Sequence, residues 1–327
     1  MEIKSLRYFV KIVDLASMSR AARALYVAQP ALSQQVASLE RELNAKLLVR
    51  SPKGVVPTPK GEIVYRHALS VMRQLEQIRI DVAAGAEQLY GHVAIGMPSS
   101  TAAILALPLL KAVKASYPGI CLEISESGVS VLREWLCQGR LDLAVLYVDG
   151  ENRPPGEVRL LTESLCLVTA ADRPASTEQE IESVSILELV DEPLVISSPT
   201  VGMRHVVDRA FASVGRAPNV VAEINMLRTI KAAVLAGIGS AILPPSAVLD
   251  EWRAGRVRIR RLRDPALSRD VVLCVSQDIP LSTPAQAVHA MVTAVVDRLV
   301  LGGEWPVCGE SGSVPQAHGH AEAPDRT

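Results

Sequence analysis

One stretch, residues 28–43 (AQPALSQQVASLEREL), constrains the fold of this chain more than any other. Its Pro30 suits the first turn of a helix, where no backbone N–H donor is needed. The apolar residues that follow recur at helical spacing and form one stripe: Leu32, Val36, Leu39 and Leu43. The opposite face is small or polar and is uncharged at its start, whereas a solvated helix usually carries Lys and Glu there. The pattern therefore predicts a helix whose outer face lies against another molecule.

The outer face of this predicted helix carries groups that can read a DNA duplex. Amide and hydroxyl side chains donate to and accept from the edges of bases, and a guanidinium reaches a phosphate or a guanine. The candidate DNA-binding residues on the helix are Gln29, Pro30, Ser33, Gln34 and Arg41.

Two shorter helices are predicted before it. An i, i+3, i+4, i+7 stripe runs through residues 6–13, and Ser19 is expected to cap a helix over residues 20–25. With a turn at residues 26–28, the three helices make a helix-turn-helix, in which the third helix enters the major groove.

A small hairpin, or wing, is predicted after the third helix. Residues 46–50 and 54–57 are its expected strands, and the turn between them spans residues 51–53. Arg50 and Lys53 are placed there for contact with backbone phosphates. Residues 1–60 are therefore expected to fold as an all-α winged helix-turn-helix domain that binds double-stranded DNA.

At these residues the chain resembles the LysR-type transcriptional regulators. The matching residues are Ser19, Ala21, Ala22, Leu25, Gln29, Pro30, Ala31, Ser33, Gln35, Leu39, Glu40, Leu43, Leu47, Arg50, Thr58 and Gly61. Asn44 and Leu48 stand where the family more often has Gly and Phe, and both changes are conservative for folding.

The resemblance continues to about residue 300. Within the family, residues 91–96, 100–103 and 107–110 look most like the nitrogen assimilation control regulators. The resemblance implies a sequence-specific transcription regulator of nitrogen or small-metabolite pathways. Its implied partners are DNA, RNA polymerase and further copies of the chain, in a homodimer or a homotetramer.

The distribution of charge agrees with binding to nucleic acid. The whole chain has a net charge of −1, but residues 1–60 hold ten Lys and Arg against four Asp and Glu, a net charge of +6. A basic module on a mildly acidic body is typical of proteins that bind nucleic acid. Aromatic residues make up only 3% of the chain, which argues against a protein that stacks single-stranded bases.

Residues 58–90 are predicted to form a linker helix that pairs two copies of the chain. Apolar residues recur there at alternating spacings of four and three, which is the seam of a coiled coil. The seam consists of Val64, Ala68, Val71, Leu75, Ile78, Val82, Gly85 and Leu89. The alternative is an amphipathic helix that packs on its own domain. The coiled coil is favoured because the small domain beside it could not bury so long a stripe.

From His92 onward, strands and helices alternate, which indicates a parallel sheet with helices on both faces. Residues 136–145 and 234–244 closely match the effector domain of the LysR family. The resemblance implies a two-lobed α/β domain at residues 91–302, similar to periplasmic binding proteins. Lobe I is expected to comprise residues 91–163 and 268–302, and lobe II residues 164–267.

A polar cleft between the lobes is the second candidate site. Hydroxyls and the N–H groups at a helix N-terminus suit a carboxylate or a phosphate beyond the carboxyl ends of strands. The candidate effector-binding residues are Ser99, Ser100, Thr101, Ser127, Thr200 and Asn225. Each of these residues, taken alone, is more simply explained as a helix cap. Only their combination from several loops around one cleft favours a binding site for a small anionic metabolite. Regulators of the nitrogen assimilation control type are, however, regarded as acting without a coinducer.

Other classes of function find little support. The chain has no G-x-S-x-G elbow, Walker loop or H-E-x-x-H, so no enzyme is predicted, and no metal or cofactor is expected. A solute-binding receptor over residues 91–300 is the better alternative, but it leaves the N-terminal module unexplained.

The remaining sequence features concern location. Five scattered cysteines without C-x-x-C spacing, the absence of a visible signal peptide and the absence of a long apolar run favour the cytoplasm, with no membrane contact. The polar segment 303–327 is expected to be a disordered tail.

Overall fold

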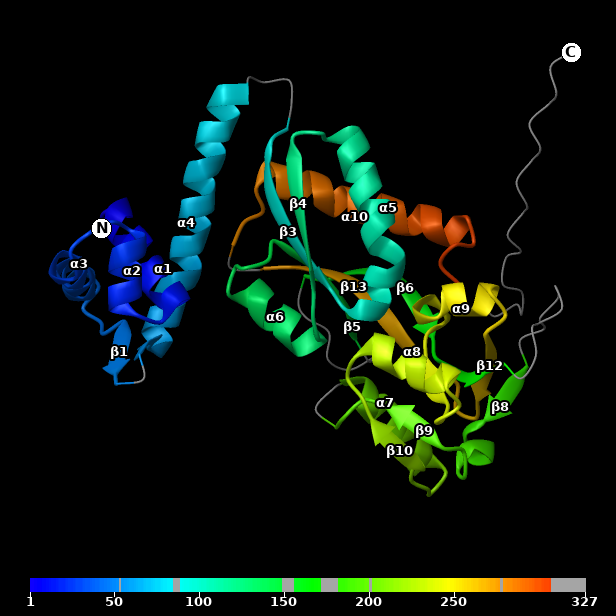
Figure 1. The fold of residues 1–327 in the computed structure, drawn as a ribbon. Helices are drawn as coiled ribbons and strands as arrows, with labels where there is room; N and C mark the ends of the chain where they lie inside the picture. The colour runs from blue at the N-terminus through cyan, green and yellow to red at the C-terminus, as the bar shows by residue number, and fades with distance from the viewer. Residues whose placement is uncertain are drawn as a thin grey trace, which may run out of the picture.

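The computed structural model describes residues 1–52, 54–84, 89–148, 156–171, 182–199, 202–276 and 279–306. This part of the chain comprises a small N-terminal domain, a long helix and a larger domain of two lobes (Figure 1). Within the described residues, no helix is both long enough and apolar enough to cross a membrane.

The N-terminal domain is a three-helix bundle followed by a two-stranded wing. Its elements are α1 (Ile3–Leu15), α2 (Met18–Ala24), α3 (Gln29–Glu42), β1 (Leu48–Ser51) and β2 (Gly54–Pro57). The apolar stripes of the helices meet in one core, which buries Phe9, Ile12, Leu32 and Leu39. α3 lies at the outer end of the molecule, away from the larger domain (Figure 1). The predicted winged helix-turn-helix fold is confirmed.

The start of α2 differs from the expectation. The side chain of Ser17, not that of Ser19, caps this helix by accepting a 3.3 Å hydrogen bond from the backbone N–H of Arg20. The earlier start brings Met18 into the helix and buries its side chain in the core. Ser19 instead donates a 2.9 Å hydrogen bond to the side-chain oxygen of Gln29, which joins α2 to α3.

The linker helix is α4 (Pro59–Ala84), and its first turns pack against α1. Ala68 is buried in the core of the N-terminal domain, and Val64 and Val71 pack against the same core. The expectation that the whole apolar seam pairs with a second chain is therefore wrong for its first part. These turns cover a part of the N-terminal core that α1 does not cover.

The later part of the expected seam does not pack on that core. Leu75 is half-buried and Ile78 is 58% exposed, and neither joins a core cluster of the described residues. The side chain of Val82 and all of Gly85 lie outside the described residues. Leu89, expected in the last turn, is not helical and packs against the core of lobe I.

Lobe I is built on a five-stranded sheet in the order β4-β3-β5-β13-β6. Its strands are β3 (Gly91–Met97), β4 (Ile120–Glu126), β5 (Leu143–Val148), β6 (Val158–Ser164) and β13 (Ser268–Val275). β3, β4 and β5 run parallel, whereas β13 runs antiparallel to β5 and to β6. Helices α5 (Ser99–Ser116) and α10 (Thr283–Leu301) cover one face, and α6 (Val129–Cys137) covers the other (Figure 1).

Lobe II contains a four-stranded sheet in the order β11-β7-β12-β8 and a parallel pair, β9 and β10. The strands are β7 (Cys166–Ala170), β8 (Ser183–Ser185), β9 (Leu194–Ile196), β10 (Val220–Glu223), β11 (Ala241–Leu243) and β12 (Val257–Arg263). The helices are α7 (Gly202–Ser213), α8 (Leu227–Leu235) and α9 (Leu249–Arg253), with the short 3-10 turns η1 (Ile186–Leu189) and η2 (Pro245–Ala247).

The sheets of both lobes are mixed, so the expectation of purely parallel sheets is wrong. β7 runs antiparallel to β11 and β12, as β13 does to its neighbours in lobe I. The chain passes between the lobes directly from β6 to β7 and from β12 to β13. The two-lobed α/β fold itself is confirmed.

The end of lobe I contains a core residue within the segment that was expected to be a disordered tail. Trp305 follows α10 and is fully buried in the core of lobe I, and Pro306 is buried beside it in sequence. The expectation of a disordered tail from residue 303 is therefore wrong for residues 303–306. Residues 307–327 lie outside the described part of the chain.

Candidate nucleic-acid interface

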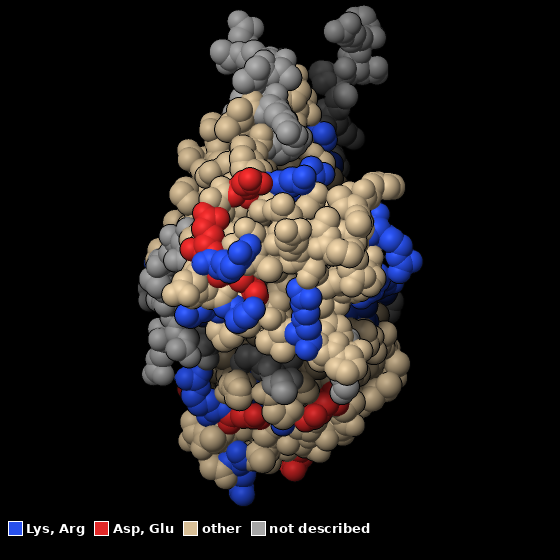
Figure 2. Space-filling view, turned by 90° about the vertical axis from the view of Figure 1, so that its left-hand side faces the viewer, with Lys and Arg blue, Asp and Glu red and all other residues tan. Residues whose placement is uncertain are grey.

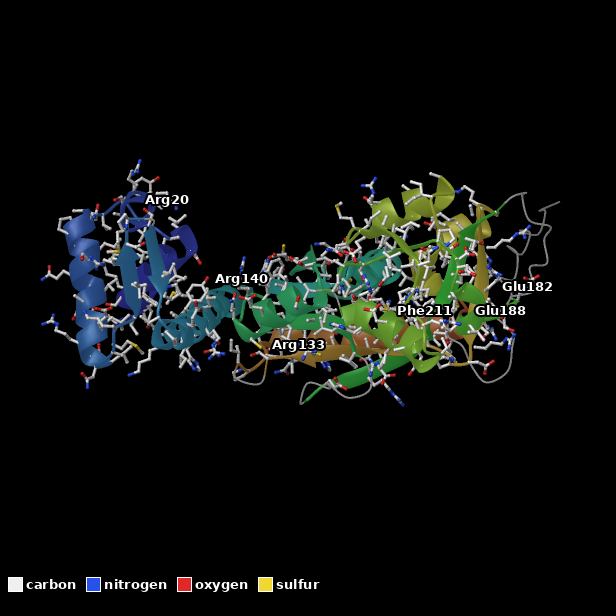
Figure 3. The ribbon with its side chains drawn as sticks, turned by 90° about the horizontal axis from the view of Figure 1, so that it is seen from below. Arg20, Arg133, Arg140, Glu182, Glu188 and Phe211 are labelled. Atoms are coloured by element: carbon white, nitrogen blue, oxygen red, sulfur yellow. The ribbon has the colours of Figure 1, made fainter. Side chains whose placement is uncertain are left out.

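α3 presents two different faces. Leu32, Val36 and Leu39 are at most 1% exposed and anchor the helix in the core. Figure 3 shows α3 at one end of the molecule, with side chains directed away from the rest of the protein. The predicted contact residues of this helix share that outer surface: Gln29, Pro30, Gln34 and Arg41 are exposed, and Ser33 is half-buried.

The N-terminus of α3 is open toward solvent. Ala28 is the N-cap residue, and no side chain caps the N–H groups of the first turn. Free N–H groups at the positive end of a helix dipole suit a phosphate. At the other end of the helix, Nε of Arg41 donates a 3.4 Å hydrogen bond to the carbonyl of Ala37, which holds the guanidinium along the outer face.

The wing is joined to α3 by one of its predicted contact residues. Nη2 of Arg50 donates a 3.1 Å hydrogen bond to the hydroxyl of Ser33. Gly54 allows the turn of the wing to pass close to α1, because its φ is +132° and a Cβ there would lie 2.7 Å from the carbonyl oxygen of Ala16. Lys53, the other predicted residue of the wing, lies outside the described residues.

Glu40 fixes the connection from α3 to the wing. Its Oε1 accepts hydrogen bonds from the backbone N–H groups of Leu47 at 2.9 Å and Leu48 at 3.4 Å, and its Oε2 accepts one from Lys46 at 2.9 Å. Desolvation raises the pKa of the Glu40 carboxyl, but the bonds from Lys46 and the two backbone groups outweigh it, so the pKa is lowered overall. The residue has a structural role and does not belong to the outer face.

Basic side chains surround the outer face. Figure 2 shows this end of the molecule, where Lys and Arg, together with some Asp and Glu, lie around an area of mostly uncharged surface. Arg20 and Arg23 on α2, which packs against α3, are both exposed and were not among the predicted contacts. Figure 3 labels Arg20 at this end. The surface therefore combines uncharged hydrogen-bonding groups with nearby positive charge, as recognition of a DNA duplex requires.

The second candidate site begins at the N-terminus of α5. Pro98 is the N-cap, and none of the following side chains caps the helix, so the explanation of these residues as caps does not hold. Ser99 donates a 2.5 Å hydrogen bond to Glu126, and Ser100 accepts one of 2.9 Å from Nη2 of Arg269. Thr101 is 1% exposed, and its hydroxyl has no hydrogen-bond partner within the described residues.

The other predicted effector residues are spread over both lobes. Ser127 is half-buried between β4 and α6. Asn225 accepts a 2.9 Å hydrogen bond from the backbone N–H of Ser198 and donates one of 3.0 Å to the hydroxyl of the same residue. Asn225 therefore joins the loops that follow β9 and β10. Thr200 lies outside the described residues.

Neither a metal site nor a disulfide is present in the described part of the chain. No group of three or more His, Cys, Asp or Glu residues there could hold a metal ion. Cys166 and Cys274 are buried, Cys121 and Cys137 are exposed, and none of these four forms a disulfide. Burial raises the pKa of the Cys274 thiol to about 12, which keeps it in the unreactive thiol form.

Comparison with known proteins covers both domains. A family model described as "Bacterial regulatory helix-turn-helix protein, lysR family" matches residues 3–62, and one described as "LysR substrate binding domain" matches residues 86–297. The chain is 37% identical over 302 residues to the nitrogen assimilation regulatory protein nac of Escherichia coli K12, covering 92% of this chain and 97% of that protein. Its identity to the nac protein of Klebsiella aerogenes is 36% over 302 residues, covering 91% and 96%.

A solved structure has the same arrangement of domains. The structure of a variant of full-length OxyR from Pseudomonas aeruginosa superimposes with a TM-score of 0.68 at 26% identity, covering 90% of this chain and 94% of that one. The helix-turn-helix surface, the two-lobed domain and these matches lead to the same assignment. The chain belongs to the LysR family of bacterial regulatory helix-turn-helix proteins and is a DNA-binding transcription regulator.

Proposed function

We propose that this regulator controls genes of nitrogen or small-metabolite pathways by binding a specific double-stranded DNA site through the outer face of α3. One observation carries the proposal: an exposed, mostly uncharged face with hydrogen-bonding side chains, anchored by a fully buried apolar stripe. The link to nitrogen rests on the printed names of the two nac relatives. The role is regulatory rather than catalytic, and its place is the cytoplasm, where the DNA lies.

The predicted contact residues divide into two groups. Gln29, Ser33 and Gln34 carry hydroxyl or amide groups that read base edges in the major groove, and Pro30 lets the first turn approach the duplex. Arg41, Arg50 and Lys53 bind phosphates and fix the register of the helix on the duplex. The bond between Arg50 and Ser33 holds one member of each group at a set distance from the other.

A homodimer, or a tetramer built from two of them, would present a pair of recognition helices to the DNA. Half-buried Leu75 and exposed Ile78 on α4 join no core cluster of the described residues, which supports pairing through the second half of that helix. Regulation then consists of a reorientation of the paired DNA-binding domains, which changes the bend of the DNA and the contact with RNA polymerase. A pair of α3 helices doubles the base and phosphate contacts that one domain makes.

The effector site is proposed at the N-terminus of α5 and the facing loops of lobe II. A small anionic metabolite would meet the hydroxyls of Ser99, Ser100 and Thr101, with Ser127, Thr200 and Asn225 around it. The uncapped N-terminus of α5 and the hydroxyl of Thr101, which has no hydrogen-bond partner within the described residues, support an anion there. The alternative function, a solute-binding receptor that does not act on DNA, would use the same site.

Footprinting on the DNA upstream of its own gene and of neighbouring genes tests the function directly. We expect a protected site whose affinity falls steeply with salt, because phosphate contacts release counterions. A protein with neither a footprint nor salt-sensitive affinity for DNA would support the solute-binding receptor instead.

A further inference from the structure

A charged pair is buried where the chain crosses between the lobes. Glu163 of β6 and Arg269 of β13 lie opposite each other in the sheet and are 0% and 4% exposed. Nε and Nη2 of Arg269 lie 2.8 and 2.7 Å from the same carboxylate oxygen, Oε2 of Glu163. Because β6 and β13 are the strands through which the chain leaves and re-enters lobe I, the pair lies at the joint of the domain.

The other carboxylate oxygen binds groups from two further parts of the fold. Oε1 of Glu163 accepts a 2.5 Å hydrogen bond from the hydroxyl of Ser246 and a 2.7 Å bond from the indole N–H of Trp305. Ser246 belongs to η2 of lobe II, whereas Trp305 follows α10 of lobe I. One buried carboxylate thus contacts lobe II and the C-terminal end of lobe I at the same time.

Arg269 connects this carboxylate to the N-terminus of α5. Its Nη2 donates to the hydroxyl of Ser100 at 2.9 Å, and its guanidinium lies 4.3 Å from the centroid of the Tyr147 ring. A single guanidinium therefore separates Ser100, at the proposed effector site, from Glu163.

Stability alone does not account for this cluster. Removing two charges from water costs free energy that their attraction only roughly offsets, and well-packed apolar residues in their place are often as stable. Hydrogen bonds add direction, which apolar contacts lack. The three hydrogen bonds and the further ion-pair contact on the Glu163 carboxylate form together only when β13, η2 and the segment around Trp305 are correctly placed.

We propose that Glu163 is an interlobe clamp, which couples the position of η2 in lobe II to the position of Trp305 at the end of α10 and so fixes the arrangement of the lobes. In a dry interior, a carboxylate oxygen that loses one donor is left partly unsatisfied and shifts within its site. That shift disturbs the remaining donor. The consequence for the bend of the DNA rests on the proposed function, whereas the coupling itself does not.

Hydrogen exchange at single backbone amides of the full-length protein tests the coupling. The reporters in lobe II are the amides of Ala247 and Val248, and the reporter at the end of α10 is the amide of Trp305; all three donate to backbone carbonyls. Ser246→Ala removes the hydroxyl donor, and Trp305→Phe removes the indole N–H but keeps an aromatic ring. Ser213→Ala is the matched control, because Ser213 donates a 2.7 Å bond to the carbonyl of Ala210 elsewhere in lobe II.

Each variant is expected to speed exchange in the segment that it does not alter. Ser246→Ala should speed exchange at residue 305, and Trp305→Phe should speed it at residues 247 and 248, by about tenfold, the effect of one lost hydrogen bond. Ser213→Ala should leave all three amides at wild-type rates. If each variant changes only its own segment, or if Ser246→Ala matches Ser213→Ala, the clamp does not exist. Failure of the proposed function would appear separately, as the lack of a DNA footprint.

Discussion

The phenol of Tyr65 on α4 donates a 2.5 Å hydrogen bond to the carboxylate of Asp14 on α1. Tyr65 is 8% exposed, so this bond fastens the linker helix to the DNA-binding domain from within its core. Figure 3 shows Arg140 at the end of the effector domain that faces α4. The bond joins α4 to α1, and both helices share one core with α3.

Replacing Tyr65 by Phe removes this bond and leaves the ring in place. We expect the free energy of unfolding of the N-terminal domain to fall by about 1.5–3 kcal/mol, the range for a hydrogen bond to a charged group. Denaturant unfolding of the variant and the wild type measures the difference. A loss below about 0.5 kcal/mol, the ordinary scatter of surface substitutions, would show that the bond does not fasten α4.

The same bond has a signature at high pH. Desolvation by burial, followed by the bond to Asp14, raises the pKa of the Tyr65 phenol well above its ordinary value of 10.0. A raised pKa means that the bond stabilises the fold fully below pH 10 and that this contribution is lost as the pH rises further. The free energy of unfolding, measured from pH 8 to 11, should fall more steeply with pH for the wild type than for Tyr65→Phe. Parallel curves would contradict the assignment.

Glu40 predicts an effect at low pH. Its pKa is lowered, mainly by hydrogen bonds that outweigh desolvation, so its contribution is present above its unfolded pKa near 4.5 and is lost as the pH falls through the folded pKa. Glu40→Gln should destabilise the domain by about 1–3 kcal/mol at pH 7 and by less below pH 4. Glu42→Gln is the control and should change little, because the exposed ion pair of Glu42 with the N-terminal amine contributes little to stability. Equal effects of the two variants at pH 7 would be inconsistent with the bonds to the wing.

Leu75 tests whether α4 pairs two chains. Leu75→Lys places a charge from each chain into the apolar seam, where loss of a buried Leu alone costs ~2–5 kcal/mol and the charge adds to it. Sedimentation should show dissociation, and the affinity for the operator should collapse, while the effector domain keeps its secondary structure. Ile63→Lys, at an exposed position off the seam, should do neither. A Leu75→Lys protein with the wild-type oligomer and full affinity would show that α4 does not pair chains.

Two truncations separate Trp305 from the residues after it. Removal of residues 307–327 should leave the melting temperature nearly unchanged, because so polar a segment buries little. Removal of residues 303–327 also deletes the fully buried Trp305, and loss of a buried Trp side chain costs about 3–5 kcal/mol. Calorimetry of both proteins measures the difference. Identical melting temperatures would contradict the role of Trp305 in the core.

The sequence predicted the parts of this fold that depend on neighbouring residues. The spacing of Leu32, Val36 and Leu39 along one helix identified its buried face and its outer face. Leu43, the fourth residue of the predicted stripe, is the C-cap and is 39% exposed, so the prediction was wrong for that residue. The prediction of Ser19 as the cap was wrong because Ser17 is an equally good cap type, and the earlier start of the helix buries Met18.

Contacts between residues that are far apart in the sequence could not be predicted from the pattern of neighbouring residues. Glu163 meets Ser246, Arg269 and Trp305 across separations of 83, 106 and 142 residues. A glutamate in one strand and a tryptophan near the end of the chain look like surface and tail residues when each is considered alone. The prediction that the whole seam of α4 pairs with a second chain was wrong in part for a related reason. The spacing of the apolar residues is the same whether they pack against a second chain or against α1.

Gln34 provides the most direct test of the central claim, that the outer face of α3 reads DNA sequence. Gln34→Ala should weaken binding to the protected operator by about 5- to 150-fold, or ~1–3 kcal/mol, and leave binding to random DNA unchanged. Lys53→Ala is the matched comparison and should weaken both alike, with a salt dependence about one unit less steep. Equal losses of Gln34→Ala on operator and random DNA would contradict the claim that this face reads bases.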